Sequence, residues 1–257
     1  MNRTAIDWFG NIMVFTLAIA VNALATSLPL GGQTPPEISA RYPSLFTPAG
    51  FTFSIWAVIY LGLFLFVIYQ SLPGQRNNKV LARIDKPFKI NCLANTAWIL
   101  AWHYDFLILS VLIMLIILAS LIVIYREFDH SDASTSLGER MLVQLPFRLY
   151  TAWITVATIA NISTVQNAMG FDNVGTDAVT WTLFKLALAG AVVAAVAVRK
   201  ADAAFIAVIA WAAYGISIKQ AATPAVAGAA EMLCILAIML ALPLAVYQLL
   251  VYVNKRL

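Results

Sequence analysis

Asparagine, threonine, tryptophan and tyrosine side chains recur inside apolar stretches of this sequence, where polar groups are costly. The residues that could form a site are Trp56, Tyr60, Asn95, Trp98, Trp153, Thr158 and Asn161. An amide in hydrocarbon needs a hydrogen-bond partner, and an indole face stacks on planar rings. Together they are suited to a mostly aromatic pocket with a few polar anchors, which would bind a large, flat, hydrophobic molecule.

The same residue types also have a purely structural interpretation. Tryptophan and tyrosine form belts at membrane surfaces, whereas asparagine and threonine join one helix to another. The residues alone leave helix packing and ligand binding both open for Asn95, Trp98, Trp153 and Asn161. Trp102 and Tyr104 stand at the end of an apolar stretch, which favours the interfacial belt for these two.

Composition places these side chains in a membrane. Of the 257 residues, 62% are apolar and 11% are charged, and the mean hydropathy is +0.85. A soluble domain carries about 25% charged residues, so much of this surface must face the lipid bilayer. The net charge of +4 comes from cations in short loops, a pattern typical of membrane topology, which argues against a nucleic-acid partner.

Eight apolar segments predict an all-α fold, a polytopic bundle of membrane-crossing helices. They span residues 8–28, 50–70, 88–103, 105–125, 146–166, 178–198, 203–219 and 226–252. A helix needs about 20 residues to cross the hydrocarbon core, so the third and seventh segments are short by that measure.

Charge in the connecting segments predicts the orientation. With eight crossings, thirteen of the sixteen Lys and Arg residues fall on one side of the membrane. This asymmetry places both termini in the cytoplasm, and a bacterial inner membrane fits it best. The proline-rich and glycine-rich residues 29–49 then lie outside, where they could form a lid over the bundle or a passive loop.

Three motifs together resemble a known family. They are Pro48 followed by Trp56-Ala-Val-Ile-Tyr60, then Asn95-Thr-Ala-Trp98, then Tyr150-Thr-Ala-Trp153-Ile-Thr155-Val-Ala157-Thr158-Ile-Ala-Asn161. In this order they resemble the TspO/MBR family, also called tryptophan-rich sensory protein, translocator protein or peripheral benzodiazepine receptor. Gly50 and Leu149 depart from the family pattern, which has tryptophan and proline there.

The resemblance covers about residues 8–168 and implies a five-helix core. We therefore expect a TspO-like domain over residues 1–170 and an extension of about three further transmembrane helices over 171–257. The resemblance places the candidate site residues in or beside the family's pocket. It implies a receptor for porphyrins or other planar hydrophobic ligands, acting in tetrapyrrole regulation or stress response, with homodimers among its members.

Two other functions stay open at this point. Light-dependent oxidative breakdown of porphyrin, known for some members, would make the protein an enzyme, with Trp98 and Trp153 as the candidate indoles. A transporter of small hydrophobic molecules is the other alternative, although no internal repeat is visible. No catalytic residue is assigned, binding is favoured over catalysis, and no cofactor is required, with a tetrapyrrole as the expected ligand.

Two intramembrane charges lie outside the resemblance. Lys185 and Glu231 fall at similar depths, about 10 Å and about 8 Å into their segments at 1.5 Å per residue. An ion pair between them would offset the cost of a lone charge in the membrane. No metal site is expected, because His103 and Asp105 supply too few converging ligands.

Overall fold

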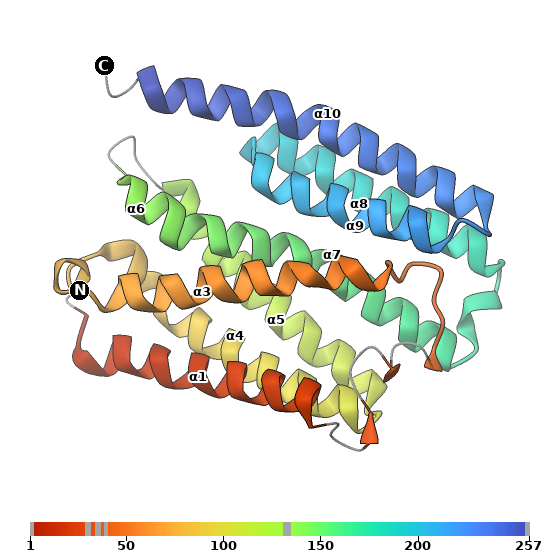
Figure 1. Cartoon of the computed structure of the whole chain (residues 1–257), viewed down its shortest axis with the longest axis horizontal. Helices are drawn as coiled ribbons and strands as arrows, with labels where there is room; N and C mark the ends of the chain where they lie inside the picture. The colour runs from red at the N-terminus through yellow and green to blue at the C-terminus, as the bar shows by residue number, and fades with distance from the viewer. Residues whose placement is uncertain (1–2, 29–31, 34–36, 39–40, 131–134, 255–257) are drawn as a thin grey trace. The chain divides into compact units, whose positions relative to one another are not determined.

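A computed structural model describes residues 3–28, 32–33, 37–38, 41–130 and 135–254 (Figure 1). Within these ranges the chain forms eight long helices joined by short connections. The long helices are α1 (Ala5–Ser27), α3 (Ile55–Ser71), α4 (Lys79–His103), α5 (Leu107–Glu127), α7 (Leu145–Ala168), α8 (Ala178–Lys200), α9 (Ala203–Lys219) and α10 (Pro224–Asn254). The short elements are η2 (Gly50–Ser54), η3 (Pro73–Gln75), η4 (Phe128–His130), α6 (Leu137–Glu139), the π-helical η5 (Arg140–Gln144) and η6 (Phe171–Asn173).

This all-helical arrangement confirms the predicted class of fold. Each predicted apolar segment overlaps one long helix. Among the described residues, five helical segments are long and apolar enough to cross a membrane, namely Ala5–Ser27, Gly50–Ser71, Leu107–Glu127, Ala178–Lys200 and Pro224–Val251, while α9 is a shorter apolar helix. Large apolar side chains such as Leu61, Ile108 and Leu242 are exposed on these helices, as expected of a surface that faces lipid.

The third long helix, α4, begins earlier than its apolar segment predicts, at Lys79 rather than near residue 88. Asn78 caps it, because its side-chain oxygen accepts a hydrogen bond from the Leu81 amide at 3.1 Å. Lys89 then pairs with Asp85 at 2.7 Å, one turn apart. The first turns of α4 are rich in charged residues, so the apolar pattern of the sequence does not include them.

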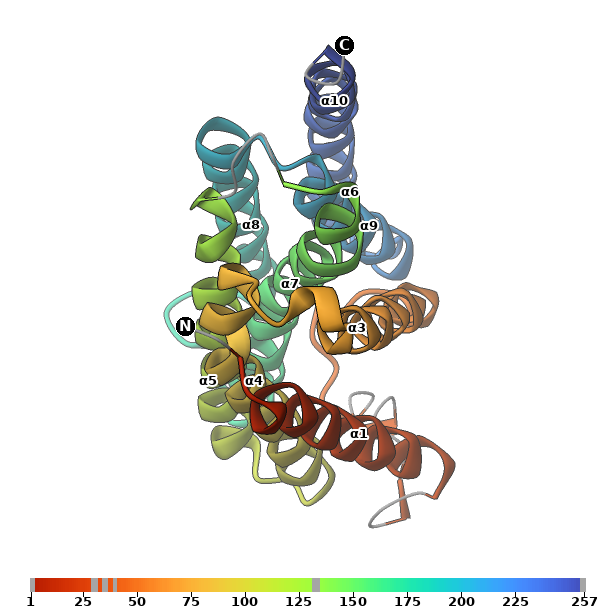
Figure 2. The ribbon, with the colours of Figure 1, turned by 90° about the vertical axis from the view of Figure 1, so that its left-hand side faces the viewer.

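The described helices belong to two compact units. The first contains Met1–Tyr42 and Trp56–Ile154, and the second contains Pro43–Ile55 and Thr155–Leu257. In the first unit α4 lies between α1 and α5 (Figure 2). In the second unit α9 packs against both α10 and α8.

The boundary between the units falls inside α7, which is a single helix that continues from one unit into the other. It therefore does not coincide with the expected end of the TspO-like domain at residue 170. The segment 43–55, far from the extension in sequence, also belongs to the second unit. Whether residues 171–257 act as a separate functional domain stays a prediction.

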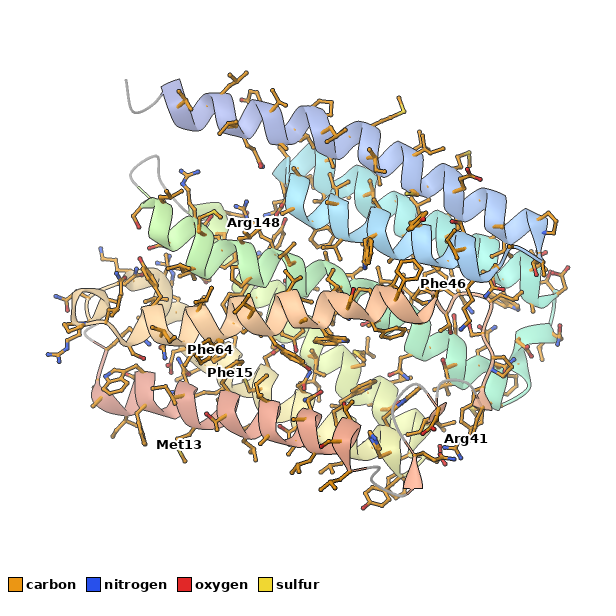
Figure 3. The ribbon with its side chains drawn as sticks, in the orientation of Figure 1. Met13, Phe15, Arg41, Phe46, Phe64 and Arg148 are labelled. Atoms are coloured by element: carbon orange, nitrogen blue, oxygen red, sulfur yellow. The ribbon has the colours of Figure 1, made fainter. Side chains whose placement is uncertain are left out.

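The core of the first unit is aromatic. The rings of Phe66, Phe88 and Phe147 lie edge to face, with centroids 4.9–5.8 Å apart. On α1, Phe15 is buried and points toward the neighbouring helices, whereas the exposed Met13 points away from them (Figure 3). This division gives α1 one packed face and one face for lipid.

Residues 29–49, expected to form a lid or a passive loop, lie partly outside the described residues. In the first unit Arg41 (Figure 3) forms an ion pair with Asp105 at 2.7 Å. Asp105 lies in the turn between α4 and α5. In the second unit Phe46 is fully buried.

Candidate ligand site

Four polar side chains from four helices form one hydrogen-bonded chain in the first unit. The Tyr60 hydroxyl on α3 donates to Oδ1 of Asn22 on α1 at 3.0 Å. Nδ2 of Asn22 donates to Oδ1 of Asn95 on α4 at 2.8 Å. Nδ2 of Asn95 donates in turn to the hydroxyl of Tyr150 on α7 at 3.1 Å. Each amide thus finds the partner that an apolar environment demands.

An aromatic cluster lies beside this chain. The Trp56 ring stacks on Tyr60, with centroids 5.1 Å apart and planes 24° apart. It also meets the rings of Tyr150 at 5.7 Å and Trp153 at 6.3 Å, both in edge contacts. Tyr150 and Trp153 are buried, whereas Trp56 and Tyr60 remain partly exposed. The cluster therefore presents part of its aromatic surface beside a polar chain that is buried at Asn95 and Tyr150.

A second indole pair lies further along α4. Trp98 and Trp102 stack with centroids 5.5 Å apart and planes 17° apart. Trp102 is buried, which corrects its expected place in an interfacial belt, while Tyr104 is exposed as expected. Trp98 itself is partly exposed.

The two remaining candidates, Thr158 and Asn161, lie on the part of α7 that belongs to the second unit. Both are buried. At 1.5 Å per residue they lie about 7.5 Å and about 12 Å along the helix from Trp153. The structure thus brings Trp56, Tyr60, Asn95 and Trp153 into one cluster in the first unit. Thr158 and Asn161 belong to the second unit.

Two members of the cluster are absent from the predicted site. Asn22 lies in the first apolar segment, which also contains Asn11, and Tyr150 opens the motif of the fifth segment. Both were visible in the sequence. Only the packing of α1 and α7 against α4 shows that they are the partners of Asn95.

A second buried polar cluster ties the N-terminal segment to α3. The Arg3 guanidinium donates to the carbonyl of Gln70 at 2.8 Å and to the Gln70 side chain, to which Nδ2 of Asn11 also donates at 3.1 Å. Burial lowers the pKa of Arg3, and the charges of Asp85 and Asp7 oppose that shift. The cluster fastens the beginning of α1 to the end of α3.

Lys185 and Glu231 do not pair with each other among the residues that the structure describes. Nζ of Lys185 instead donates to Oε1 of Gln166, on α7, at 2.6 Å. Glu231 is exposed on α10. The partner of Lys185 in the second unit is therefore neutral, whereas the sequence predicted a charged one. The prediction missed Gln166 because helix periodicity does not show which helices are neighbours.

His103 and Asp105, which were weighed as metal ligands, have separate partners. Nδ1 of His103 bonds the carbonyl of Ile99 at 2.8 Å, within the last turn of α4. Asp105 binds Arg41 through both carboxylate oxygens, at 2.7 and 2.8 Å.

Apolar helices of membrane-crossing length, enclosing polar side chains that bond one another, define a multi-pass integral membrane protein. Residues 7–246 match the family described as TSPO-like protein, and the chain belongs to that family. The match extends through α8 and α9 into α10. No curated protein and no solved structure matches the chain.

Proposed function

We propose that this protein is a membrane receptor that binds porphyrin-like or other planar hydrophobic molecules at the aromatic cluster of the first unit. The observation that carries the proposal is the partly exposed, stacked pair of Trp56 and Tyr60 beside the chain that joins Asn22, Asn95 and Tyr150. Membership in the TSPO-like family supports a binding function.

The chemistry of the cluster favours a flat ligand with polar groups at its edge. A ring system can stack on the indole face of Trp56, which supplies most of the contact area. An asparagine amide has two N–H donors and an oxygen with two lone pairs, and Asn95 uses one donor and one lone pair in the chain. Its remaining capacity can orient an edge group without breaking that chain.

Tryptophan fluorescence tests the proposal directly. We expect protoporphyrin to quench the fluorescence of the protein in nanodiscs, with a Kd that rises about two- to twelvefold in Trp56→Leu, since an aromatic pair contributes about 0.5–1.5 kcal/mol beyond area burial. Trp8→Phe is the matched control, because Trp8 lies near the start of α1, about 20 Å along the helix from Asn22. Equal affinity in Trp56→Leu, Asn95→Ala and the wild type would remove this cluster as the site.

Light-dependent breakdown of the bound porphyrin is a second candidate, favoured by the stacked indoles Trp98 and Trp102. Indoles close to an excited ring can donate electrons or react with the oxygen species that it generates. Bleaching of the porphyrin absorbance under light, lost in Trp98→Phe and Trp153→Phe, would support an enzyme. Stable absorbance with intact binding would support a receptor.

The charge asymmetry of the loops supports a cytoplasmic position for both termini, in a bacterial inner membrane. Roles in tetrapyrrole regulation or stress response are proposals that follow from ligand binding in this family.

A further inference from the structure

The segment Pro43–Ile55, which leads directly into α3, is fastened to α9. The amide of Ala49 donates to the carbonyl of Gly215 at 2.9 Å. From the same helix, Nε1 of Trp211 donates to the carbonyl of Thr52 at 3.0 Å. Two hydrogen bonds thus join backbone groups of this segment to a helix more than 150 residues away, and all four residues belong to the second unit.

Side-chain packing reinforces these bonds. The Phe51 ring meets Trp211 and Tyr214 edge-on, with centroids 5.4 and 5.9 Å away. Thr52 is fully buried, and its hydroxyl bonds the carbonyl of Ala49, which closes the turn at η2. Thr52 is thus buried beside one backbone hydrogen bond, from Ala49 to Gly215, and its carbonyl accepts another from the Trp211 indole.

Gly215 is the residue that permits this contact. A Cβ at this position would overlap Cγ2 of Thr52 and would come within 3.2 Å of Cβ of Pro48. Glycine is disfavoured in the interior of a helix, so its presence in α9 calls for a close approach of another backbone. The partner here is a connecting segment and not another helix.

We propose that α9 acts as a clasp on residues 43–55, with Trp211 and Gly215 as positioning residues for the start of α3. The chain runs from Thr52 through η2 into α3, where Trp56 is the second residue, so release of the clasp frees the backbone that carries this indole. Release then sets the rates at which a planar ligand enters and leaves. This last step rests on the proposed function, whereas the clasp itself does not.

The first measurement follows the segment without any ligand. Hydrogen exchange of the amides in residues 43–55 is compared in nanodiscs for the wild type and Gly215→Ala. We expect exchange about tenfold faster in the variant, because the added methyl group separates Gly215 from Thr52. Gly228→Ala is the matched control, since no atom lies within 4 Å of a Cβ built at that position in the same unit.

A compensating change sharpens this test. Thr52→Ser removes Cγ2 but retains the hydroxyl that bonds Ala49, so it should restore slow exchange in the Gly215→Ala background. Trp211→Phe keeps an aromatic ring against Phe51 but removes the indole N–H with part of the ring, so it should raise exchange without disturbing the helix. Exchange in residues 43–55 that stays at the wild-type rate in both Gly215→Ala and Trp211→Phe would overturn the clasp.

The second measurement uses stopped-flow mixing with protoporphyrin. We expect both the association and the dissociation rate to rise several-fold in Gly215→Ala, with a smaller change in Kd, because a gate affects both directions alike. Faster exchange with unchanged rates would overturn the gating step. A wild type that binds no porphyrin would contradict the proposed function, and the exchange measurements would still decide whether the clasp exists.

Discussion

Asn95 stands at the centre of the polar chain in the first unit, where it accepts from Asn22 and donates to Tyr150. Asn95 is buried, so water cannot easily take its place as the hydrogen-bond partner of Asn22 and Tyr150. In hydrocarbon, asparagine contributes to helix association only when it is paired. The same residue therefore has a structural and a proposed ligand-binding role.

Replacing Asn95 with alanine should lower stability as well as ligand affinity. The change leaves Asn22 and Tyr150 each short of a partner, at a cost of about 1–3 kcal/mol. Thermal unfolding in nanodiscs measures this, with the exposed Asn77→Ala in the same unit as control. An unchanged melting temperature in Asn95→Ala would contradict the hydrogen-bonded chain.

Lys185 should couple to Gln166 and not to Glu231, because its Nζ donates to the Gln166 side chain. In a double-mutant cycle of Lys185→Met with Gln166→Leu we expect a coupling free energy of about 0.5–3 kcal/mol. The matched cycle of Lys185→Met with Glu231→Gln should give a value close to zero. Coupling in the second cycle alone would restore the ion pair that the sequence predicted.

At the scale of the elements, α3 and α7 approach closely at Gly62. A Cβ at this position would lie 3.0 Å from Cβ and Cγ of Pro146 and 3.5 Å from its Cα. A proline ring has no rotamer that could move it aside, so the helices themselves would have to separate. The small residue thus sets the distance between two helices that carry the aromatic cluster.

Gly62→Ala should therefore destabilise the protein despite the higher helix propensity of alanine. Overpacking costs about 1–3 kcal/mol and alanine regains about 1 kcal/mol, which leaves a net loss of about 1 kcal/mol. Gly74→Ala, with no atom within 4 Å of its added Cβ, should be neutral. Unfolding in a denaturant series compares the two, and equal stability would show that the helices can separate freely.

The beginning of α8 should be sensitive to acid. Oδ1 of Asp177 accepts a hydrogen bond from the Thr180 amide at 2.7 Å. This backbone hydrogen bond is the main reason why the pKa of the Asp177 carboxyl group is lowered. A lowered pKa means that the cap stabilises the helix above the unfolded-state pKa and is lost as the pH falls through the folded value. NMR of the amide of Thr180 should show fraying of the first turn below about pH 4, and Asp177→Asn should remove the pH dependence.

At the scale of the whole molecule, the loops predict a fixed orientation that labelling can test. In right-side-out vesicles, Asn173→Cys should react with a membrane-impermeant maleimide, whereas Asn77→Cys should react only after permeabilisation. The wild type is the control, because Cys92 and Cys234 are both buried. The reverse pattern would place the termini outside and would overturn the positive-inside assignment.

The local sequence pattern is enough to predict the helices and the class of fold. Apolar length and the scarcity of charge decide membrane insertion, since every backbone polar group in lipid must bond within its own helix. The motifs also named Trp56, Tyr60, Asn95 and Trp153, which lie together in the first unit, and their part in ligand binding stays a prediction. These properties are local, so they can be read without knowing which helices touch.

The partners of the polar side chains became known from the packing of the helices. This packing joined Asn95 to Tyr150, gave Lys185 to Gln166, and set residues 43–55 on Gly215. Within lipid, one apolar surface is as well solvated as another, so helix neighbours are chosen by close contacts between small residues and by hydrogen bonds. Such contacts depend on the rotation and crossing of two helices, which the periodicity of a single sequence does not contain.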